Sequence, residues 1–167
     1  MRSRNNAAIH CKVVVAATVA LWSWFVCAAI AADFSGKVVG VTDGDTITVI
    51  HNGRGEKIRL YGIDCPEKRQ AFGNRAKQAA SELAFGKSVT VMSHGRDRYK
   101  RTIGEVILPD GKNLNQKLVR EGFCWWYRKY APEDSTLDRL ETEAREAKRG
   151  LWMDPNPIPP WEWRHKK

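Results

Sequence analysis

Apolar and polar residues alternate in five short segments, which is the pattern of half-buried β-strands. We expect strands at residues 34–41, 46–50, 56–62, 88–92 and 102–108. Asn52-Gly53, between the second and third segments, is a strong signal for a tight hairpin turn. The third strand should then place Ile58 and Leu60 on one face and Arg59 on the other.

Three later segments carry apolar residues at helical spacing. We expect one helix from a cap at Asn74 to residue 85, a second at residues 113–121, and a third from a cap at Ser135 to Gly150. Residues 154–167 are rich in proline and should be extended or flexible. Five strands with late helices favour an α+β class, mainly β, in which a small barrel carries its helices outside.

The first 32 residues have the composition of a secretory signal peptide. Arg2, Arg4 and Lys12 precede an apolar, uncharged stretch at residues 13–32, and Ala29-Ile30-Ala31 fits a cleavage site. An uncleaved membrane anchor is the alternative, since about 20 apolar residues can cross a bilayer. Either interpretation exports the folded domain, which we place at residues 33–153.

The charge of the chain indicates what it binds, and its cysteines indicate a disulfide. The chain carries 28 Lys and Arg against 19 Asp and Glu, and three of the basic residues lie in the leader, which leaves a net charge of +6. A basic excess suits a polyanionic partner. Cys65 and Cys124 remain after the leader, and an even pair in an exported protein predicts a disulfide. Two buried thiols are the alternative.

The segment from residue 42 to 67 concentrates acids on one hairpin. Folding it about Gly53 brings Asp45 and Asp64 to the same end, with Arg59 and Glu67 nearby. Two adjacent carboxylates repel unless a cation lies between them, and a hard divalent ion suits oxygen ligands. This combination indicates phosphate-ester chemistry, although each acid taken alone could be only a turn former.

These motifs together resemble the staphylococcal nuclease family. The matching strings are DGDT, IRLYGIDCPE, DRYKR, NLNQKLVREG and WWYRKYAP, in that order, and they span residues 34–152. The resemblance implies the five-stranded OB-fold barrel with three packed α-helices.

The resemblance also implies roles for individual residues. Glu67 would be the general base, and Arg59 and Arg101 would bind the phosphate. A calcium ion would be held by Asp45, Asp64 and the backbone carbonyl of Cys65. The family usually has threonine in place of Cys65, a change that a backbone ligand tolerates.

Substrate contacts follow the same resemblance with one departure. Tyr99 and Tyr130 match pocket tyrosines that can stack on a base, and Arg98 would assist electrostatically. Arg128 stands where the family has a second tyrosine, so we expect it to contact phosphate and leave base preference open.

The resemblance therefore implies a secreted or periplasmic, calcium-dependent endonuclease. It would cut DNA and RNA with low sequence specificity by in-line attack of water, favour single strands and leave 3′-phosphate ends. We expect a monomer without an obligate protein partner, associated with a membrane only if the leader is retained. The alternative is a non-catalytic OB-fold module that binds nucleic acid, and the presence of Arg59, Glu67 and Arg101 argues against it.

Overall fold

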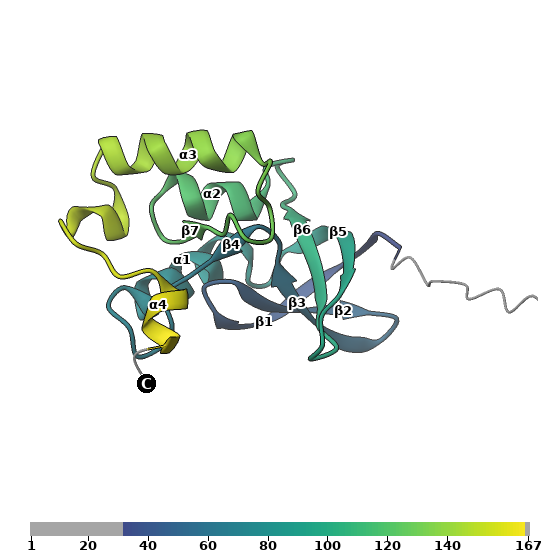
Figure 1. Cartoon of the computed structure of the whole chain (residues 1–167). Helices are drawn as coiled ribbons and strands as arrows, with labels where there is room; N and C mark the ends of the chain where they lie inside the picture. The colour runs from purple at the N-terminus through teal and green to yellow at the C-terminus, as the bar shows by residue number, and fades with distance from the viewer. Residues whose placement is uncertain (1–31, 166–167) are drawn as a thin grey trace, which may run out of the picture.

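The computed structural model describes residues 32–165, in which five strands close into a barrel (Figure 1). The barrel order is β1-β2-β3-β6-β5, and only the β3–β6 pair is parallel. The strands are β1 (Phe34–Asp43), β2 (Thr46–His51), β3 (Arg54–Leu60), β5 (Ser88–Arg96) and β6 (Thr102–Ile107). The five-stranded barrel predicted from the alternation is confirmed.

The hairpin between β2 and β3 sets the register of the site. Asn52 and Gly53 both have positive φ, as a two-residue hairpin turn of this kind requires. Thr46 pairs with Arg59, and the Leu60 N–H donates to the Asp45 carbonyl at 2.9 Å. Asp45 therefore lies level with the end of the third strand, as the sequence predicts.

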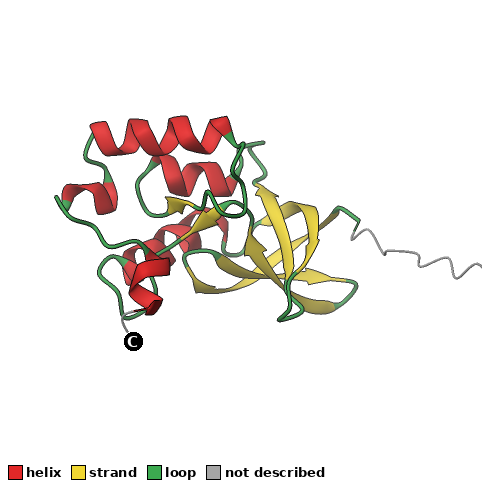
Figure 2. Cartoon of the chain, in the orientation of Figure 1, coloured by secondary structure: helices red, strands yellow, loops and turns green. Residues whose placement is uncertain are grey.

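Two short strands and five helical segments complete the fold, mostly on one side of the barrel (Figure 2). The short strands β4 (Ile63–Asp64) and β7 (Trp125–Trp126) pair with each other and were not expected as strands. The helices are α1 (Gly73–Ala84), α2 (Leu114–Arg120), α3 (Ser135–Glu146), the 3₁₀ turn η1 (Gly150–Met153) and α4 (Pro160–His165).

Two of the predicted helix caps are wrong. Asn74 lies inside α1, and the cap is Phe72 in a left-handed conformation with φ 68°. Asp134 rather than Ser135 caps α3, because its carboxylate accepts a hydrogen bond from the Leu137 N–H at 2.9 Å. Both helices begin within two residues of the expected position.

The proline-rich tail differs from expectation, since α4 folds back against the rest of the chain. Pro160 occupies the first helical position, where its missing N–H is tolerated. The Pro159 carbonyl accepts from the N–H groups of Glu162 and Trp163, both at 3.1 Å. Prolines at the start of a segment therefore permit the helix that they would forbid in its interior.

The core has two parts. One fills the barrel and the space under α1, α2 and α3, with side chains that include Ile47, Ile58 and Leu60. The other is a smaller aromatic cluster of Trp125, Trp152 and their neighbours, against which Trp161 packs. No helix within residues 32–165 is long and apolar enough to cross a membrane. The predicted leader lies outside these residues.

Glu56 on β3 provides a test of how the stability of the barrel depends on pH. It accepts hydrogen bonds from Thr102 and from His51, and Arg96 Nη2 lies 2.8 Å from its carboxylate. Burial opposes ionisation, but these hydrogen bonds and the Arg96 charge lower the pKa of Glu56 below 4.5. A lowered pKa in the folded state contributes stability above the ordinary pKa, and this contribution is lost as the pH falls through the lower value.

We therefore expect Glu56→Gln to lower the free energy of unfolding by about 1 kcal/mol at pH 7. The difference from wild type should shrink as the pH falls through the lowered pKa of Glu56, because the wild-type carboxylate then takes up a proton. Urea denaturation at pH 7 and pH 3 measures both values. Glu133→Gln, at an exposed position, is the control and should behave as wild type at both pH values.

Candidate active site

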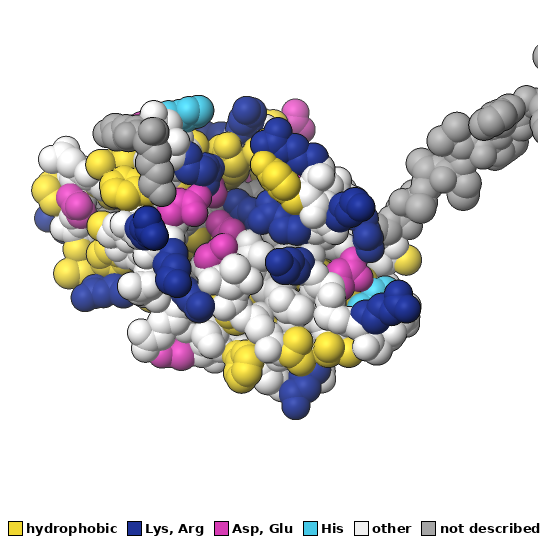
Figure 3. Space-filling model, turned by 90° about the horizontal axis from the view of Figure 1, so that it is seen from below, with side chains coloured by type: hydrophobic (Ala, Val, Ile, Leu, Met, Phe, Trp, Pro, Cys, Tyr) yellow, Lys and Arg dark blue, Asp and Glu magenta, His cyan; other side chains and the backbone are white. Residues whose placement is uncertain are grey.

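The predicted chemistry gathers in one pocket of about 860 Å³. Its walls come from the β1–β2 loop, the end of β3, β4, the β5–β6 loop, the segment after β7 and α4. A space-filling view shows acidic side chains in a hollow with Lys and Arg around it (Figure 3). The predicted residues among the lining are Asp45, Arg59, Asp64, Cys65, Glu67, Arg98, Tyr99, Arg101 and Tyr130.

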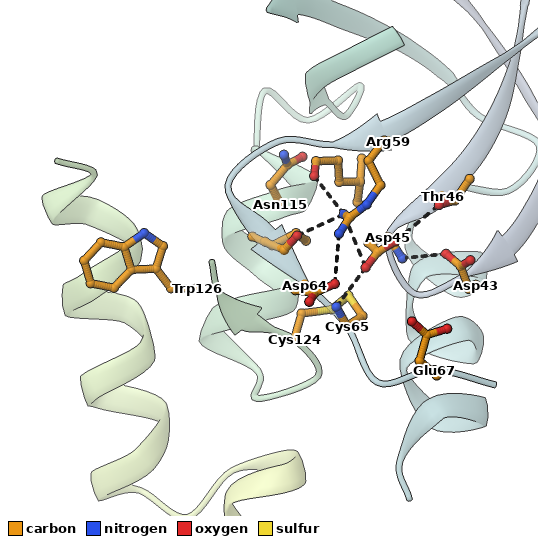
Figure 4. Close-up of a disulfide and its surroundings, with 12 residues drawn as sticks. Asp43, Asp45, Thr46, Arg59, Asp64, Cys65, Glu67, Asn115, Cys124 and Trp126 are labelled. Atoms are coloured by element: carbon orange, nitrogen blue, oxygen red, sulfur yellow. Dashed lines mark hydrogen bonds and ion pairs between the residues drawn. A yellow bond between two sulfur atoms is a disulfide. The ribbon is translucent and has the colours of Figure 1, made fainter. Parts of the chain in front are cut away.

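Asp45 and Asp64 form a buried acid pair, with 7% and 1% of their surfaces exposed (Figure 4). Asp45 accepts from the Cys65 N–H at 2.8 Å and from the Thr46 hydroxyl at 3.2 Å. Burial raises the pKa of Asp64, although Arg164 donates a hydrogen bond that lowers it. Two carboxylates removed from water in this way require positive charge beside them.

Arg59 supplies part of that charge. Its Nη2 lies 2.9 Å from Asp64 Oδ1, and its Nη1 lies 3.3 Å from Asp45 Oδ2. Nη1 also donates to the carbonyls of Leu60 and Ile63, at 3.0 and 2.9 Å. The structure therefore ties Arg59 to the acid pair and to the backbone at the wall of the pocket.

Glu67 is fixed at its backbone and partly exposed at its carboxylate. Gln70 accepts from the Glu67 N–H at 3.0 Å, and the Gln70 N–H donates to the Glu67 carbonyl at 2.8 Å. A Cβ atom on Gly73 would lie 2.0 Å from that carbonyl oxygen, so the corner requires glycine there. The carboxylate therefore extends into the pocket from a rigid corner, and one of its oxygens, Oε1, pairs with Arg164 Nη1 at 2.8 Å.

Arg101 is oriented by Asp97, which the sequence analysis did not single out. Asp97 accepts from the Arg101 N–H at 2.9 Å and from its Nε at 2.7 Å. Burial works against ionisation, but these hydrogen bonds lower the pKa of Asp97. With Nε held by Asp97, Arg101 Nη1 lies 3.5 Å from Thr46 Oγ1.

The tyrosines and basic residues expected to bind substrate divide into two groups. Tyr99 and Tyr130 line the pocket with 63% and 61% of their surfaces exposed, and Arg98 packs over the Tyr99 ring. Arg128 is not among the pocket residues, because its guanidinium pairs with Glu141 at 3.0 Å and lies over the Trp126 ring. The expected phosphate contact of Arg128 therefore has no geometric support.

Four further lining residues were missed. Tyr127 and Lys129 belong to the aromatic and basic segment after β7, and His94 stacks on Tyr61 at the pocket wall. Arg164 of α4 reaches the acid pair from the far end of the chain. No local pattern marks Arg164, whereas the run of aromatic and basic residues around Tyr127 could have been read as pocket lining.

The acid pair fits a hard divalent cation. Its donors are carboxylate oxygens, and arginines neutralise them in this structure. Burial and the adjacent Asp45 raise the pKa of Asp43 to about 6, which marks the same pocket as strongly negative. Within residues 32–165 no group of three His, Cys, Asp or Glu side chains could hold a metal, so backbone carbonyls and waters would have to complete the coordination.

The disulfide expected between Cys65 and Cys124 is formed, with the Cα atoms 4.2 Å apart (Figure 4). It joins the corner that carries Asp64 to the start of β7. Asp64 pairs with Trp125 across the two short strands, so the bridge and the strand pairing fix the same corner.

Comparison with known proteins identifies the family. Residues 57–154 match the family described as "Staphylococcal nuclease homologue". The chain is also 42% identical over 166 residues to "Micrococcal nuclease" of Shigella flexneri, covering 94% of this chain and 90% of the relative. The chain belongs to the staphylococcal nuclease family. As such it is a hydrolytic nuclease whose substrates are nucleic acids, and nucleases of this family generally depend on a metal.

Two Escherichia coli relatives extend the comparison of this nuclease. It is 48% identical over 147 residues to a protein named "Uncharacterized endonuclease", covering 88% of this chain and 94% of the relative. It is 38% identical over 176 residues to "Protein ParB", covering 99% of this chain and 96% of the relative. The similarity to these relatives therefore covers most of each chain.

The disulfide should contribute strongly to the nuclease's stability, because it closes a loop with a sequence separation of 59 residues. The double substitution Cys65→Ala and Cys124→Ala should lower the free energy of unfolding by about 4 kcal/mol on chain-entropy grounds. Urea denaturation of the oxidised wild type, the dithiothreitol-reduced wild type and the variant measures this. The reduced wild type should match the variant, and equal stability of all three would contradict the bridge.

Proposed function

We propose that this nuclease is an exported, calcium-dependent endonuclease that cuts DNA and RNA with little sequence preference and leaves 3′-phosphate ends. The proposal rests on one observation. A single pocket holds the buried acid pair, the partly exposed Glu67 and several arginines, including Arg59 and Arg101. These are the groups that hydrolysis of a phosphodiester needs for charge neutralisation and for activation of water.

Calcium is the cation that the donor set supports best. Asp45 and Asp64 present carboxylate oxygens, and the remaining positions would fall to the Cys65 carbonyl and to waters. When bound, the ion supplies positive charge that polarises the phosphate and helps to position water. No thiolate or imidazole cluster within residues 32–165 offers the softer ligands that zinc prefers.

The side chains divide the chemistry among them. Glu67 accepts a proton from the attacking water, whose oxygen forms the new bond to phosphorus. Arg59 and Arg101 donate hydrogen bonds to the phosphate oxygens as negative charge builds on them. The bond from phosphorus to the 5′ oxygen breaks, the departing oxygen takes a proton from solvent water to leave as a hydroxyl, and Glu67 returns its proton to solvent. The phosphate then remains on the 3′ side.

The pocket favours an open nucleic-acid strand. Tyr99 and Tyr130 expose their rings at its edge, where unpaired bases can stack. Arg98 and Lys129 add positive charge for the backbone on either side. Since stacking and phosphate contacts do not distinguish the bases, this supports low sequence preference and activity on both DNA and RNA.

Digestion of denatured DNA and of RNA tests the proposal. Wild type should cleave both with calcium present, and a calcium chelator should abolish cleavage. Glu67→Gln should lower kcat by at least about 100-fold, because general acid–base catalysis is typically worth 10²–10⁴-fold.

Glu146→Gln, at an exposed position on α3, is the matched control and should cleave at the wild-type rate. Cleavage that survives the chelator would overturn the metal assignment. An unchanged rate for Glu67→Gln would overturn its role as base. End-group analysis that found 5′-phosphates would overturn the proposed direction of bond breaking.

Export is supported by the leader-like composition of residues 1–32 and by the Cys65–Cys124 disulfide, which persists in oxidising compartments. We expect the protein recovered from the periplasm or the culture medium to begin at Ala32 or Asp33. N-terminal sequencing of the recovered protein measures this. A retained Met1 in a membrane fraction would instead favour the anchor, and recovery from the cytosol would contradict export.

A further inference from the structure

The C-terminal helix α4 delivers an arginine to the acid pair. Arg164 Nη2 lies 2.6 Å from Asp64 Oδ2, and its Nη1 lies 3.3 Å from Asp64 Oδ1. The same Nη1 lies 2.8 Å from Glu67 Oε1. One guanidinium therefore bridges the proposed metal ligand and the proposed general base.

Contacts outside the acid pair hold α4 in this place. Gln70, which braces the Glu67 corner, donates from Nε2 to the Ile158 carbonyl at 2.6 Å. Trp161 stacks on Tyr127 with ring centroids 5.2 Å apart, and its edge meets Trp125. Arg164 therefore reaches the pocket from a packed segment of the protein.

Both oxygens of Asp64 are occupied as a result. Oδ1 receives Arg59 and Arg164, and Oδ2 receives Arg164. A carboxylate that is to bind a divalent ion must offer an oxygen to it, and a guanidinium on that oxygen both blocks and repels the ion. The same ion pair occupies one oxygen of Glu67, which must be free to accept a proton.

The two arginines that pair with Asp64, Arg59 and Arg164, differ in their other hydrogen-bond partners. Arg59 also donates to the backbone carbonyls of Leu60 and Ile63. These hydrogen bonds keep it at the pocket wall even when the carboxylates bind another cation. The polar contacts of the Arg164 guanidinium within residues 32–165 are to Asp64 and Glu67 alone. Arg164 is therefore the cation that can be displaced.

We propose that Arg164 is an active-site residue that takes the place of the divalent cation in the metal-free nuclease and competes with it for Asp64. Metal binding displaces the guanidinium, and Glu67 is released in the same event. This inference rests on the proposed metal site. It adds that a residue of the same chain, Arg164, competes with the metal for that site. The acid pair is thereby neutralised in both states, by Arg164 without metal and by the ion with it.

Calcium binding without substrate tests this competition. Isothermal titration of the chelator-treated protein should give a calcium Kd about tenfold lower for Arg164→Gln than for wild type, because a charge-assisted bond to a buried carboxylate no longer opposes the ion. Arg164→Lys keeps the charge and should stay near the wild-type Kd. Arg139→Gln is the matched control for loss of one charge, since Arg139 pairs with Glu143 on α3, and its Kd should not change.

Thermal unfolding adds a second measurement that does not depend on activity. Without calcium, Arg164→Gln should melt below wild type, because the buried acid pair has lost a counter-ion. At saturating calcium the two should melt together. A Kd for Arg164→Gln that is unchanged or higher would overturn the proposal, since a residue that only supports the site would weaken calcium binding when removed.

A wild-type measurement covers the case in which the variant does not fold. Solvent exchange of the Arg164 guanidinium N–H protons, followed by NMR, should speed up when calcium is added, because the guanidinium loses its hydrogen bonds to Asp64 and Glu67. Slower or unchanged exchange would overturn the proposal. If wild type binds no calcium at all, the proposed cofactor fails, and this result is distinct from a failure of the competition alone.

Discussion

The constraint on which the pocket depends is the burial of two like charges. Asp45 and Asp64 lie almost wholly out of water, and each needs a cation because an unpaired buried carboxylate is strongly destabilising. Three features of the molecule address that requirement: Arg59 from β3, Arg164 from α4, and the Cys65 N–H that donates to Asp45. The strands and helices around the pocket bring these groups together.

The barrel meets the requirement through the end of a single hairpin. Because Thr46 pairs with Arg59, the guanidinium emerges beside Asp45, and the turn after β3 carries the chain directly to Asp64. The disulfide then holds Cys65 against the segment before β7. A rigid frame keeps the carboxylates close despite their repulsion, which is the preorganisation that binding a small ion requires.

Local sequence signals were enough to predict the β2–β3 hairpin, whereas the cap of α1 and the position of Arg164 depend on contacts that no local pattern indicates. The Asn52-Gly53 turn and the alternation after it fix the β2–β3 register, so the proximity of Asp45, Arg59 and Asp64 could be predicted. The cap of α1 could not be predicted, because Phe72 adopts a left-handed conformation that the sequence does not signal. Arg164 lies 100 residues from Asp64 along the chain, and the stacking of Trp161 on Tyr127 places it; no local pattern reports such a contact.

The same positive charge cannot both stabilise the acid pair without metal and leave metal binding unaffected. In the proposed site, any free energy that Arg164 contributes to the metal-free state would be subtracted from the affinity for the ion, because both would use the same oxygens of Asp64. Arg59 avoids most of this conflict by sharing its hydrogen bonds with backbone carbonyls, which remain when the carboxylates turn to a metal. On this proposal, the nuclease gains a folded metal-free state at the expense of metal affinity, and the position of α4 sets that balance.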